Sequence, residues 1–246
     1  MLAAFVFINS VFVCSAFSQN ENEKTAASKP ESKTELVEKN QSGDKDKDGS
    51  AGKEGWHVFR GDAGSSGVAT SKLPEKLETL WEYKVPGGKG AFESTAVIAK
   101  SSTDQKPIAY IGDLDGTLYA LDLETGELKW SKKLTFSFSS SPAYRDGLIY
   151  IGDIDGELFC VDEKGNTKWK FTCEGEISSS PNFYKGDVLF GSQDSKLYLL
   201  NAKTGEKIWA HETPDQIRCS ITVAGCLLYT SPSPRDRTRS RMPSSA

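Results

Sequence analysis

The sequence predicts an all-β protein: a partial β-propeller made of four-stranded antiparallel blades. Two observations lead to this prediction. One pattern recurs every 39 or 40 residues, as the spacing of Gly112, Gly152 and Gly191 shows. Within each repeat, short apolar runs alternate in side-chain direction and are bounded by turn residues such as Asp-Gly, which is the pattern of antiparallel strands. Four such strands in each repeat are typical of a propeller blade.

Three aligned segments define the repeat. They read YIGDLDGTLYALDLETGELKW at 110–130, YIGDIDGELFCVDEKGNTKW at 150–169 and LFGSQDSKLYLLNAKTGEKIW at 189–209. A second landmark, rich in serine in two of its copies, keeps the same period and recurs at 90–98, 136–144, 175–183 and 215–223. Because one blade cannot cover its own apolar faces, neighbouring repeats must stack.

The strands of the first repeat are expected at about 92–98, 108–111, 117–122 and 128–134. We predict three complete blades, followed by the start of a fourth. The predicted blades begin near Phe92, Phe138, Ile177 and Ile217. Trp81 marks a strand that corresponds to the last strand of a blade whose other strands are not upstream of it.

The segment ALDLETGELKW resembles the tryptophan-docking motif of pyrroloquinoline-quinone-like (PQQ-like) propeller repeats, A-x-D-x-x-T-G-x-x-x-W. The matching residues are Ala120, Asp122, Thr125, Gly126 and Trp130, then Asp162, Gly165 and Trp169, then Thr204, Gly205 and Trp209, with Trp81 upstream. Asn201 stands where the motif has Asp. The resemblance covers residues 56–225. It implies that each indole packs between adjacent blades and that the Asp and the Thr-Gly turn stabilise the loop at the corner of the blade. It also implies that the intact ring has more blades than this chain and that this chain is an N-terminal fragment.

The same resemblance leaves two functions open, because a fold does not fix a function. Some PQQ-like propellers are quinoprotein dehydrogenases that use the quinone and calcium, whereas others are binding scaffolds such as the BamB-type protein that assists outer-membrane protein assembly. We expect a scaffold that binds envelope proteins or a small ligand, with no catalytic, metal or cofactor residues in this fragment. The alternative is a fragment of a PQQ-dependent dehydrogenase, which would require PQQ and calcium.

Four positions at the starts of the blades are candidates for facing the central channel. They are Glu93, Ser139, Ser178 and Arg218, which differ from blade to blade. The alternative is that the two charged residues are simply solvated at strand starts. A second set of polar residues, Asp113, Asp115, Asp153 and Asp155, recurs at the same turn and is therefore interpreted as structural. The serines are not expected to be nucleophiles, because the chain has only two histidines to serve as a base.

The first 55 residues predict export. Residues 1–18 are largely apolar and end in Ala16-Phe17-Ser18, which is typical of a secretory signal peptide. Cys14 leaves open a lipid anchor instead. Residues 19–55 are charged and polar, which predicts a disordered linker. We therefore expect a protein of the periplasm, the cell envelope or the extracellular space, without a transmembrane span in the mature chain.

The last segment, residues 226–246, does not continue the repeat. It holds four of the seven arginines and no lysine, and its string CLLYTSPSPRD resembles a translated sequencing-library adapter. We interpret it as a non-native, disordered tail. Excluding its four Arg and one Asp changes the formal charge from −4 to −7, which argues against nucleic acid as a partner.

Re-sequencing of the natural gene across the codon for Gly225 should replace residues 226–246 with a continuation of the repeat. We expect a strand, a Gly-Asp or Gly-Ser turn and a second strand that ends near Asp or Asn. Uninterrupted genomic reads that encode the arginine-rich run through to Ala246 would contradict this interpretation.

Overall fold

The computed structural model describes residues 55–69, 78–86 and 90–224. It also assigns three strands outside these ranges, β1 (Phe5–Ile8), β2 (Val11–Cys14) and β17 (Leu227–Thr230). The predicted linker lies outside the described residues except for Gly55, and so does the tail beyond Thr230. The described part of the chain is all-β, as predicted.

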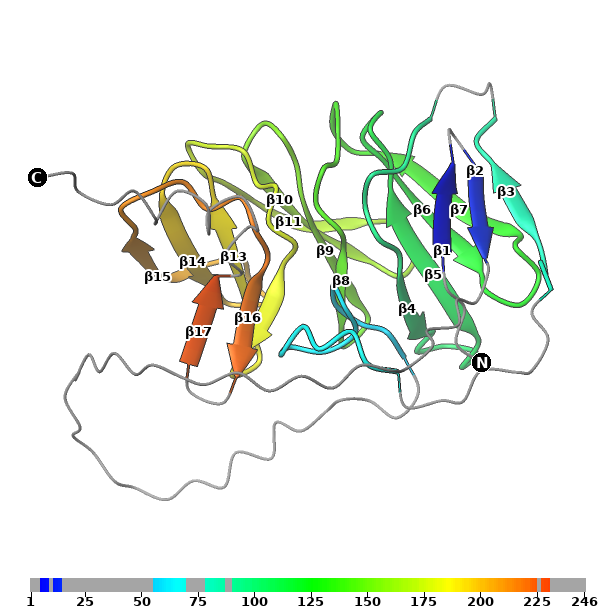
Figure 1. The fold of residues 1–246 in the computed structure, drawn as a ribbon, viewed down its shortest axis with the longest axis horizontal. Coiled ribbons are helices and arrows are strands. Elements are labelled where there is room, and N and C mark those ends of the chain that lie inside the picture. Colours follow the sequence, from blue (N-terminus) through cyan, green and yellow to red (C-terminus); the bar gives the residue numbers. More distant parts are fainter. Residues whose placement is uncertain are drawn as a thin grey trace, which may run out of the picture.

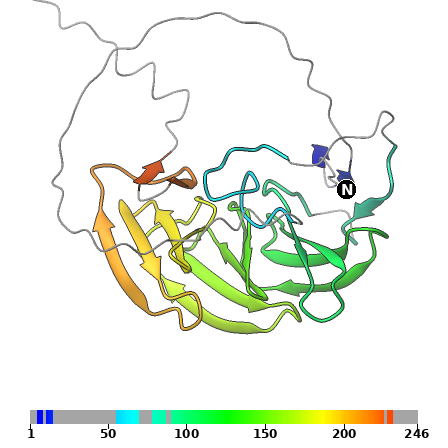
Figure 2. The same ribbon diagram turned by 90° about the horizontal axis from the view of Figure 1, so that it is seen from below.

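Three four-stranded antiparallel sheets stand side by side as the blades of an arc (Figure 1). Blade 1 contains β4 (Val97–Lys100), β5 (Pro107–Gly112), β6 (Thr117–Asp122) and β7 (Leu128–Lys133). Blade 2 contains β8 (Ala143–Arg145), β9 (Leu148–Gly152), β10 (Glu157–Asp162) and β11 (Thr167–Thr172). Blade 3 contains β12 (Asn182–Tyr184), β13 (Asp187–Ser192), β14 (Lys196–Leu200) and β15 (Lys207–Glu212). The first strand of each blade lies on the concave side of the arc (Figure 2).

Incomplete sheets stand at both ends of the arc. At one end, β16 (Ile221–Ala224) pairs with β17, which lies at the start of the segment that the sequence predicts to be a disordered tail. At the other end, β3 (Glu82–Lys84) pairs with β2, and β2 pairs with β1. The strand next to Trp81 is therefore paired here with residues of the predicted signal peptide, whose cleavage stays a prediction.

The first strand of each blade begins later than the sequence predicts. In blade 1 the expected start near Phe92 is wrong by five residues, because β4 begins at Val97. Serine side chains explain the difference. Ser94 Oγ donates to the carbonyl of Gly112 at 2.7 Å, and the backbone N–H of Thr95 donates to Ser141 Oγ of the next blade at 2.8 Å. Here a backbone N–H group bonds to a serine hydroxyl, whereas in a strand it would bond to a carbonyl of the neighbouring strand.

The same serine bonds recur along the arc. Ser141 N–H donates to Ser180 Oγ at 3.0 Å, and Ser180 N–H donates to Ser220 Oγ at 3.1 Å. Each serine thus accepts a hydrogen bond from a backbone N–H group of the preceding blade, as a buried N–H requires. The serine-rich runs therefore have a structural role.

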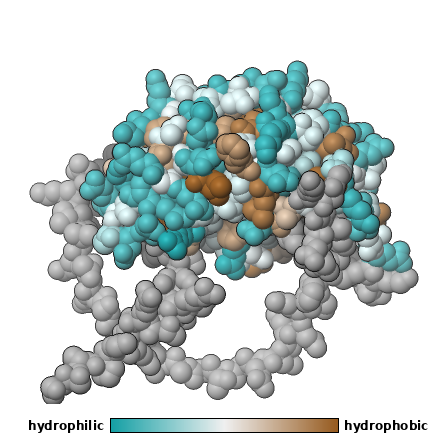
Figure 3. Space-filling model, turned by 90° about the horizontal axis from the view of Figure 1, so that it is seen from above, coloured by the Kyte–Doolittle hydropathy of each residue, from teal (hydrophilic) through white to brown (hydrophobic). Residues whose placement is uncertain are grey.

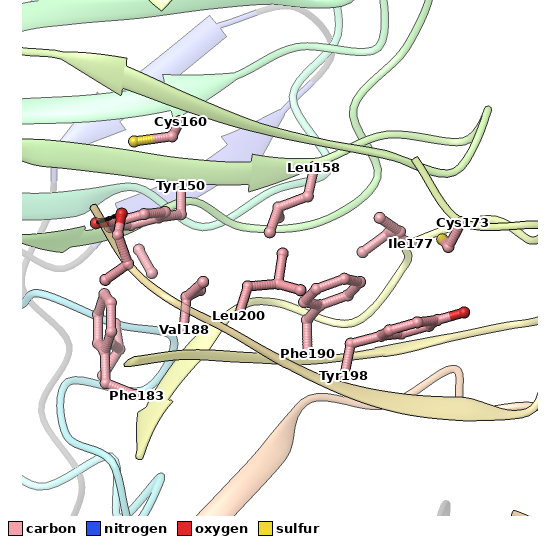
Figure 4. Packing of buried hydrophobic residues seen from close by; sticks show 13 residues of the cluster. Tyr150, Leu158, Cys160, Cys173, Ile177, Phe183, Val188, Phe190, Tyr198 and Leu200 are labelled. Atoms are coloured by element: carbon pink, nitrogen blue, oxygen red, sulfur yellow. Dashed lines mark hydrogen bonds between the residues drawn. The ribbon is translucent and has the colours of Figure 1, made fainter. Parts of the chain in front are cut away.

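The hydrophobic core lies in layers between the blades. On β9, Tyr150 faces blade 3 while Ile149 and Ile151 face blade 1, because neighbouring strand residues point to opposite faces. Figure 4 shows the layer between blades 2 and 3, where Leu158 of one blade meets Phe190 of the other. The residues at the predicted blade starts are all buried and belong to the core: Phe92, Phe138, Ile177 and Ile217.

Indole rings connect each sheet to the next. Trp81 Nε1 donates to the carbonyl of Leu123 at 2.8 Å, Trp130 Nε1 to that of Glu163 at 2.6 Å and Trp169 Nε1 to that of Ala202 at 3.1 Å. Each ring also covers the glycine of the turn that it binds. A Cβ atom on Gly126, Gly165 or Gly205 would lie 2.6, 3.2 or 2.6 Å from the ring.

The motif carboxylate folds the turn that receives the indole. Asp122 Oδ1 accepts the N–H groups of Glu124 and Thr125 at 3.0 and 3.1 Å. Asn201 Oδ1 accepts the corresponding pair in blade 3, from Lys203 and Thr204, both at 3.0 Å. Asn201 keeps these two turn bonds because they need only an oxygen acceptor. It cannot form the ion pair that Asp122 makes with Lys129 at 3.0 Å.

A lead-in segment, residues 55–69, crosses the first strands of several blades (Figures 1 and 2). Trp56 exchanges two backbone hydrogen bonds with Ile98, both 2.8 Å long. Tyr144 N–H then donates to the carbonyl of His57 at 2.7 Å, and Val223 N–H donates to that of Ala63 at 2.8 Å. The lead-in therefore contacts the first, the second and the incomplete fourth sheet.

The substitution Gly205→Ala should destabilise the protein more than Gly147→Ala. Both residues have positive φ, 75° and 79°, so each alanine costs about 1 kcal/mol of backbone strain. A Cβ atom on Gly147 would meet nothing within 4 Å, whereas one on Gly205 would strike Trp169, which adds about 2 kcal/mol. Urea unfolding of both variants measures the difference, and equal losses of stability would contradict the role of the indole.

Candidate functional site

The propeller presents two faces with different residues. The turn face, at the top in Figure 1, consists of the turns 113–116, 153–156 and 192–195 together with the connections 134–137, 173–176 and 213–216. The lead-in face, opposite, carries residues 55–69 and the turns that follow the first strand of each blade. Each face is a candidate for binding.

The recurring carboxylates of the turn face are structural, as the sequence analysis interprets them. Asp113 accepts the N–H of Thr117 at 2.7 Å and the hydroxyl of Tyr119 at 2.8 Å. Asp153 accepts the N–H of Glu157 at 2.7 Å and the hydroxyl of Thr135 at 2.6 Å. Burial raises the pKa of Asp153 above its usual value despite these bonds.

The four predicted channel positions lie in the runs that precede the first strands. Glu93 and Arg218 are exposed, and they are far apart in the arc, in blade 1 and before β16. Ser139 and Ser178 are half-buried, and each contacts a longer polar side chain. Ser139 Oγ donates to Glu176 Oε1 at 3.3 Å, and Gln193 Nε2 donates to Ser178 Oγ at 3.4 Å. The structure does not bring the four side chains into one cluster, and their binding role stays a prediction.

Exposed apolar side chains mark the turn face in blades 1 and 2. Phe136 is 80% exposed and Ile154 is 41% exposed. The turn at Gly116 packs against the backbone of Phe136, and Ile154 N–H donates to the carbonyl of Ser137 at 3.4 Å, so the two residues lie on adjoining loops. Figure 3 shows the molecule from above, with hydrophobic residues gathered near the middle of a largely hydrophilic face.

A pocket of about 460 Å³ lies at the lead-in face. Its walls come from the lead-in, from Ser102 of blade 1, and from the first strands and turns of blades 2 and 3. His57 lies in this wall, with its ring centroid 5.6 Å from that of Tyr144. Burial lowers the pKa of His57, so the imidazole is neutral near pH 7. Arg145 and Phe183 line the same space.

Neither Phe136 nor the pocket is predicted from the sequence, for different reasons. Phe136 aligns with Gly175 and Asp215 in the later repeats, and this change at an otherwise regular position was a usable signal. The pocket had no such signal, because the lead-in lies outside the repeat, and Arg145 and Phe183, which line the same pocket, are far from it in the sequence.

No group of three or more His, Cys, Asp or Glu side chains in 55–69, 78–86 and 90–224 is arranged to hold a metal ion. No helix in the described part of the chain has the length and hydrophobicity of a membrane span.

The comparisons with known proteins agree on the fold. Residues 114–224 match the family model described as outer membrane protein assembly factor BamB. No curated protein matches the chain. Among solved structures, BamB from Moraxella catarrhalis is similar, with 24% identity and a TM-score of 0.53 over 62% of this chain and 46% of that one. The chain thus spans about half the length of that protein.

Two other solved structures resemble the chain at lower identity. The computationally designed protein Ika8 is 18% identical, with a TM-score of 0.52 over 63% of this chain and 46% of that one. A quinohemoprotein alcohol dehydrogenase from Pseudomonas putida HK5 is 16% identical, with a TM-score of 0.52 over 59% of this chain and 35% of that one. These likenesses show a shared propeller architecture.

The stability of the protein should fall as the pH drops below about 6.5, the ordinary pKa of histidine. Because burial lowers the pKa of His57 in the folded state, the unfolded chain binds a proton first, and the stabilisation present above pH 6.5 is lost below it. His57→Gln should flatten this slope between about pH 7 and 5 in urea unfolding. Replacing the exposed His211 on β15 is the control, and an unchanged slope in His57→Gln would contradict the assignment.

Proposed function

We propose that this PQQ-like propeller repeat protein is a binding scaffold of the cell envelope, which holds a protein partner on its turn face. The observation that carries the proposal is Phe136. Its ring is 80% exposed, at a position where the other repeats have Gly175 and Asp215. Since those repeats fold without an aromatic residue, the fold does not require one here. Exposed aromatic side chains of this kind are enriched in protein interfaces.

The charges near Phe136 indicate the chemistry of the partner. Asp115 is exposed in the turn 113–116, Asp155 is exposed next to Ile154 in the turn 153–156, and Glu174 is exposed in the connection 173–176. Two cations lie near these carboxylates: the ammonium of Lys133 contacts the carbonyl of Asp115, and Lys196 Nζ pairs with Glu174 at 3.5 Å. A partner segment with an apolar side chain between Lys or Arg residues would complement this surface.

The turn carboxylates support binding over catalysis. Those of Asp113 and Asp153 are already bonded to backbone N–H groups and to hydroxyls, so calcium coordination or proton transfer would break the turns. The family description, outer membrane protein assembly factor, is consistent with a protein partner and with an envelope location. The proposal includes no quinone and no calcium in this chain.

The photo-reactive residue p-benzoylphenylalanine at position 136 should yield one discrete adduct when the full chain is irradiated in cells that carry the natural gene. The same residue at Ile208, which is 49% exposed on the outer strand β15, is the control and should not yield it. Charge reversal by Asp115→Lys and Asp155→Lys together should reduce the adduct about tenfold, because a basic partner would be repelled. Glu212→Lys on β15 should leave it unchanged.

Three outcomes would overturn the proposal. They are no adduct from position 136, the same adducts from both positions, and an adduct that the charge reversal does not weaken. Alcohol oxidation with a dye acceptor, after addition of PQQ and calcium to the full chain, would instead favour the dehydrogenase alternative.

A further inference from the structure

We propose that β15 pairs edge to edge with β15 of a second copy of this chain, which makes the protein a symmetric dimer. The outer strands β7, β11 and β15 lie on the convex side of the arc (Figure 2). Among the described residues, each of them pairs with one neighbouring strand of its own sheet. The other edge of such a strand presents backbone N–H and C=O groups that a further strand can bind. This surface is separate from Phe136, so the dimer goes beyond the proposed role of the turn face.

The free backbone groups of β15 come from alternate residues. Thr213 N–H donates to the carbonyl of Ser195 at 2.8 Å, across the sheet toward β14. Because hydrogen-bonded positions alternate in an antiparallel ladder, the backbone groups of Ala210 and Glu212 point away from β14. Equivalent bonds set the same pattern in β7 and β11, from Leu134 to Gly116 and from Cys173 to Gly156.

Lysines occupy the free edges of β7 and β11 but not that of β15. The residues directly before and after the tryptophan differ between the three strands: Lys129 and Ser131, Lys168 and Lys170, Ile208 and Ala210. Lysine on an edge strand protects it against pairing with another chain, because the charge resists burial. At β15 this protection is absent, and Ile208 and Ala210 are both exposed.

The apolar character of β15 comes from the loss of an ion pair that the other two blades keep. Lys129 Nζ lies 3.0 Å from the carboxylate of Asp122, and Lys168 Nζ lies 2.9 Å from that of Asp162. In blade 3 both members of the pair are different, since Asn201 and Ile208 stand at the aligned positions. Blade 3 leaves Ile208 49% exposed, so a second copy that covers it would remove apolar surface from water.

A two-fold axis at Ala210 gives β15 a self-pairing without opposed like charges. Antiparallel strands related by this axis place Ala210 opposite its own copy, with the free backbone groups of both facing each other. Ile208 then lies opposite Glu212 of the second copy. Pro214 has no N–H to donate, so the ladder ends before it.

The equivalent self-pairing of the other two outer strands would oppose lysines. In β11 the axis would pass through Lys170 and bring its two copies together. In β7 it would bring Lys129 opposite Lys133. Like charges directly opposite each other destabilise a strand pair, so β15 is the outer strand of these three that suits a second copy.

Sedimentation velocity of the full chain over a wide range of concentrations should show a monomer–dimer equilibrium. We expect a weak dimer, because one strand pair buries less than the roughly 1,200 Å² at which stable interfaces begin. Ala210→Lys should weaken it about fivefold by opposing two like charges. Since Lys170 holds the aligned position in blade 2, the variant should fold. Ser131→Lys, the same substitution at the aligned position of β7, is the matched control and should leave the dimer unchanged.

Ala210→Cys tests the pairing of the strands directly. Opposed residues of a hydrogen-bonded antiparallel pair have Cα atoms about 5.5 Å apart, which is within the range of a disulfide. Mild oxidation should therefore give a covalent dimer from Ala210→Cys that exceeds any formed by the wild-type chain or by Ser131→Cys.

The proposal is overturned if the wild-type chain stays monomeric, if Ala210→Lys associates as tightly as the wild type, or if the Ser131 variants behave like the Ala210 variants. Association that Ala210→Lys leaves intact would point instead to the incomplete sheets at the ends of the arc. None of these results bears on position 136. A cross-link from position 208 would join two copies of the chain, so its mass distinguishes it from an adduct with another protein.

Discussion

The arc depends on the contact between an indole ring and a turn of the next blade. A single four-stranded sheet has two apolar faces and cannot cover either by itself, so its stability comes from its neighbours. The indole also determines how each sheet is oriented on its neighbour. It donates one hydrogen bond to a turn carbonyl and lies against a glycine, so each sheet is fixed in rotation as well as in distance. The layers of core residues between the blades follow from this placement.

Much of this fold could be predicted from the sequence, because the interactions that build it recur. The tryptophans, the turn glycines and the Asp or Asn acceptors repeat every 39 or 40 residues, and the structure shows these groups in one corner of each blade. The starts of the first strands were less predictable. An extended run that bonds to serine hydroxyls has the same apolar alternation as a strand, so periodicity alone cannot separate the two.

The candidate sites were less predictable than the fold, because function in a repeat protein lies where the repeat is broken. Phe136 departs from an aligned column, and the lead-in lies outside the alignment altogether. A comparison of exposed positions between the repeats could have identified Phe136 from the sequence. The pocket needed coordinates, since Arg145 and Phe183 become neighbours of His57 only when the lead-in is bound across the blades.

The lead-in has a consequence for the order in which the protein folds. Blades are local units, whose strands can pair as soon as the following residues are available. Ala63, in contrast, accepts a hydrogen bond from Asn182, which is 119 residues later in the chain. During synthesis the lead-in emerges before the blades, and Trp56 can pair with Ile98 once blade 1 has folded. The bond from Asn182 to Ala63 can form only when the third blade is present, so the docking of the lead-in is completed only after all three blades have assembled.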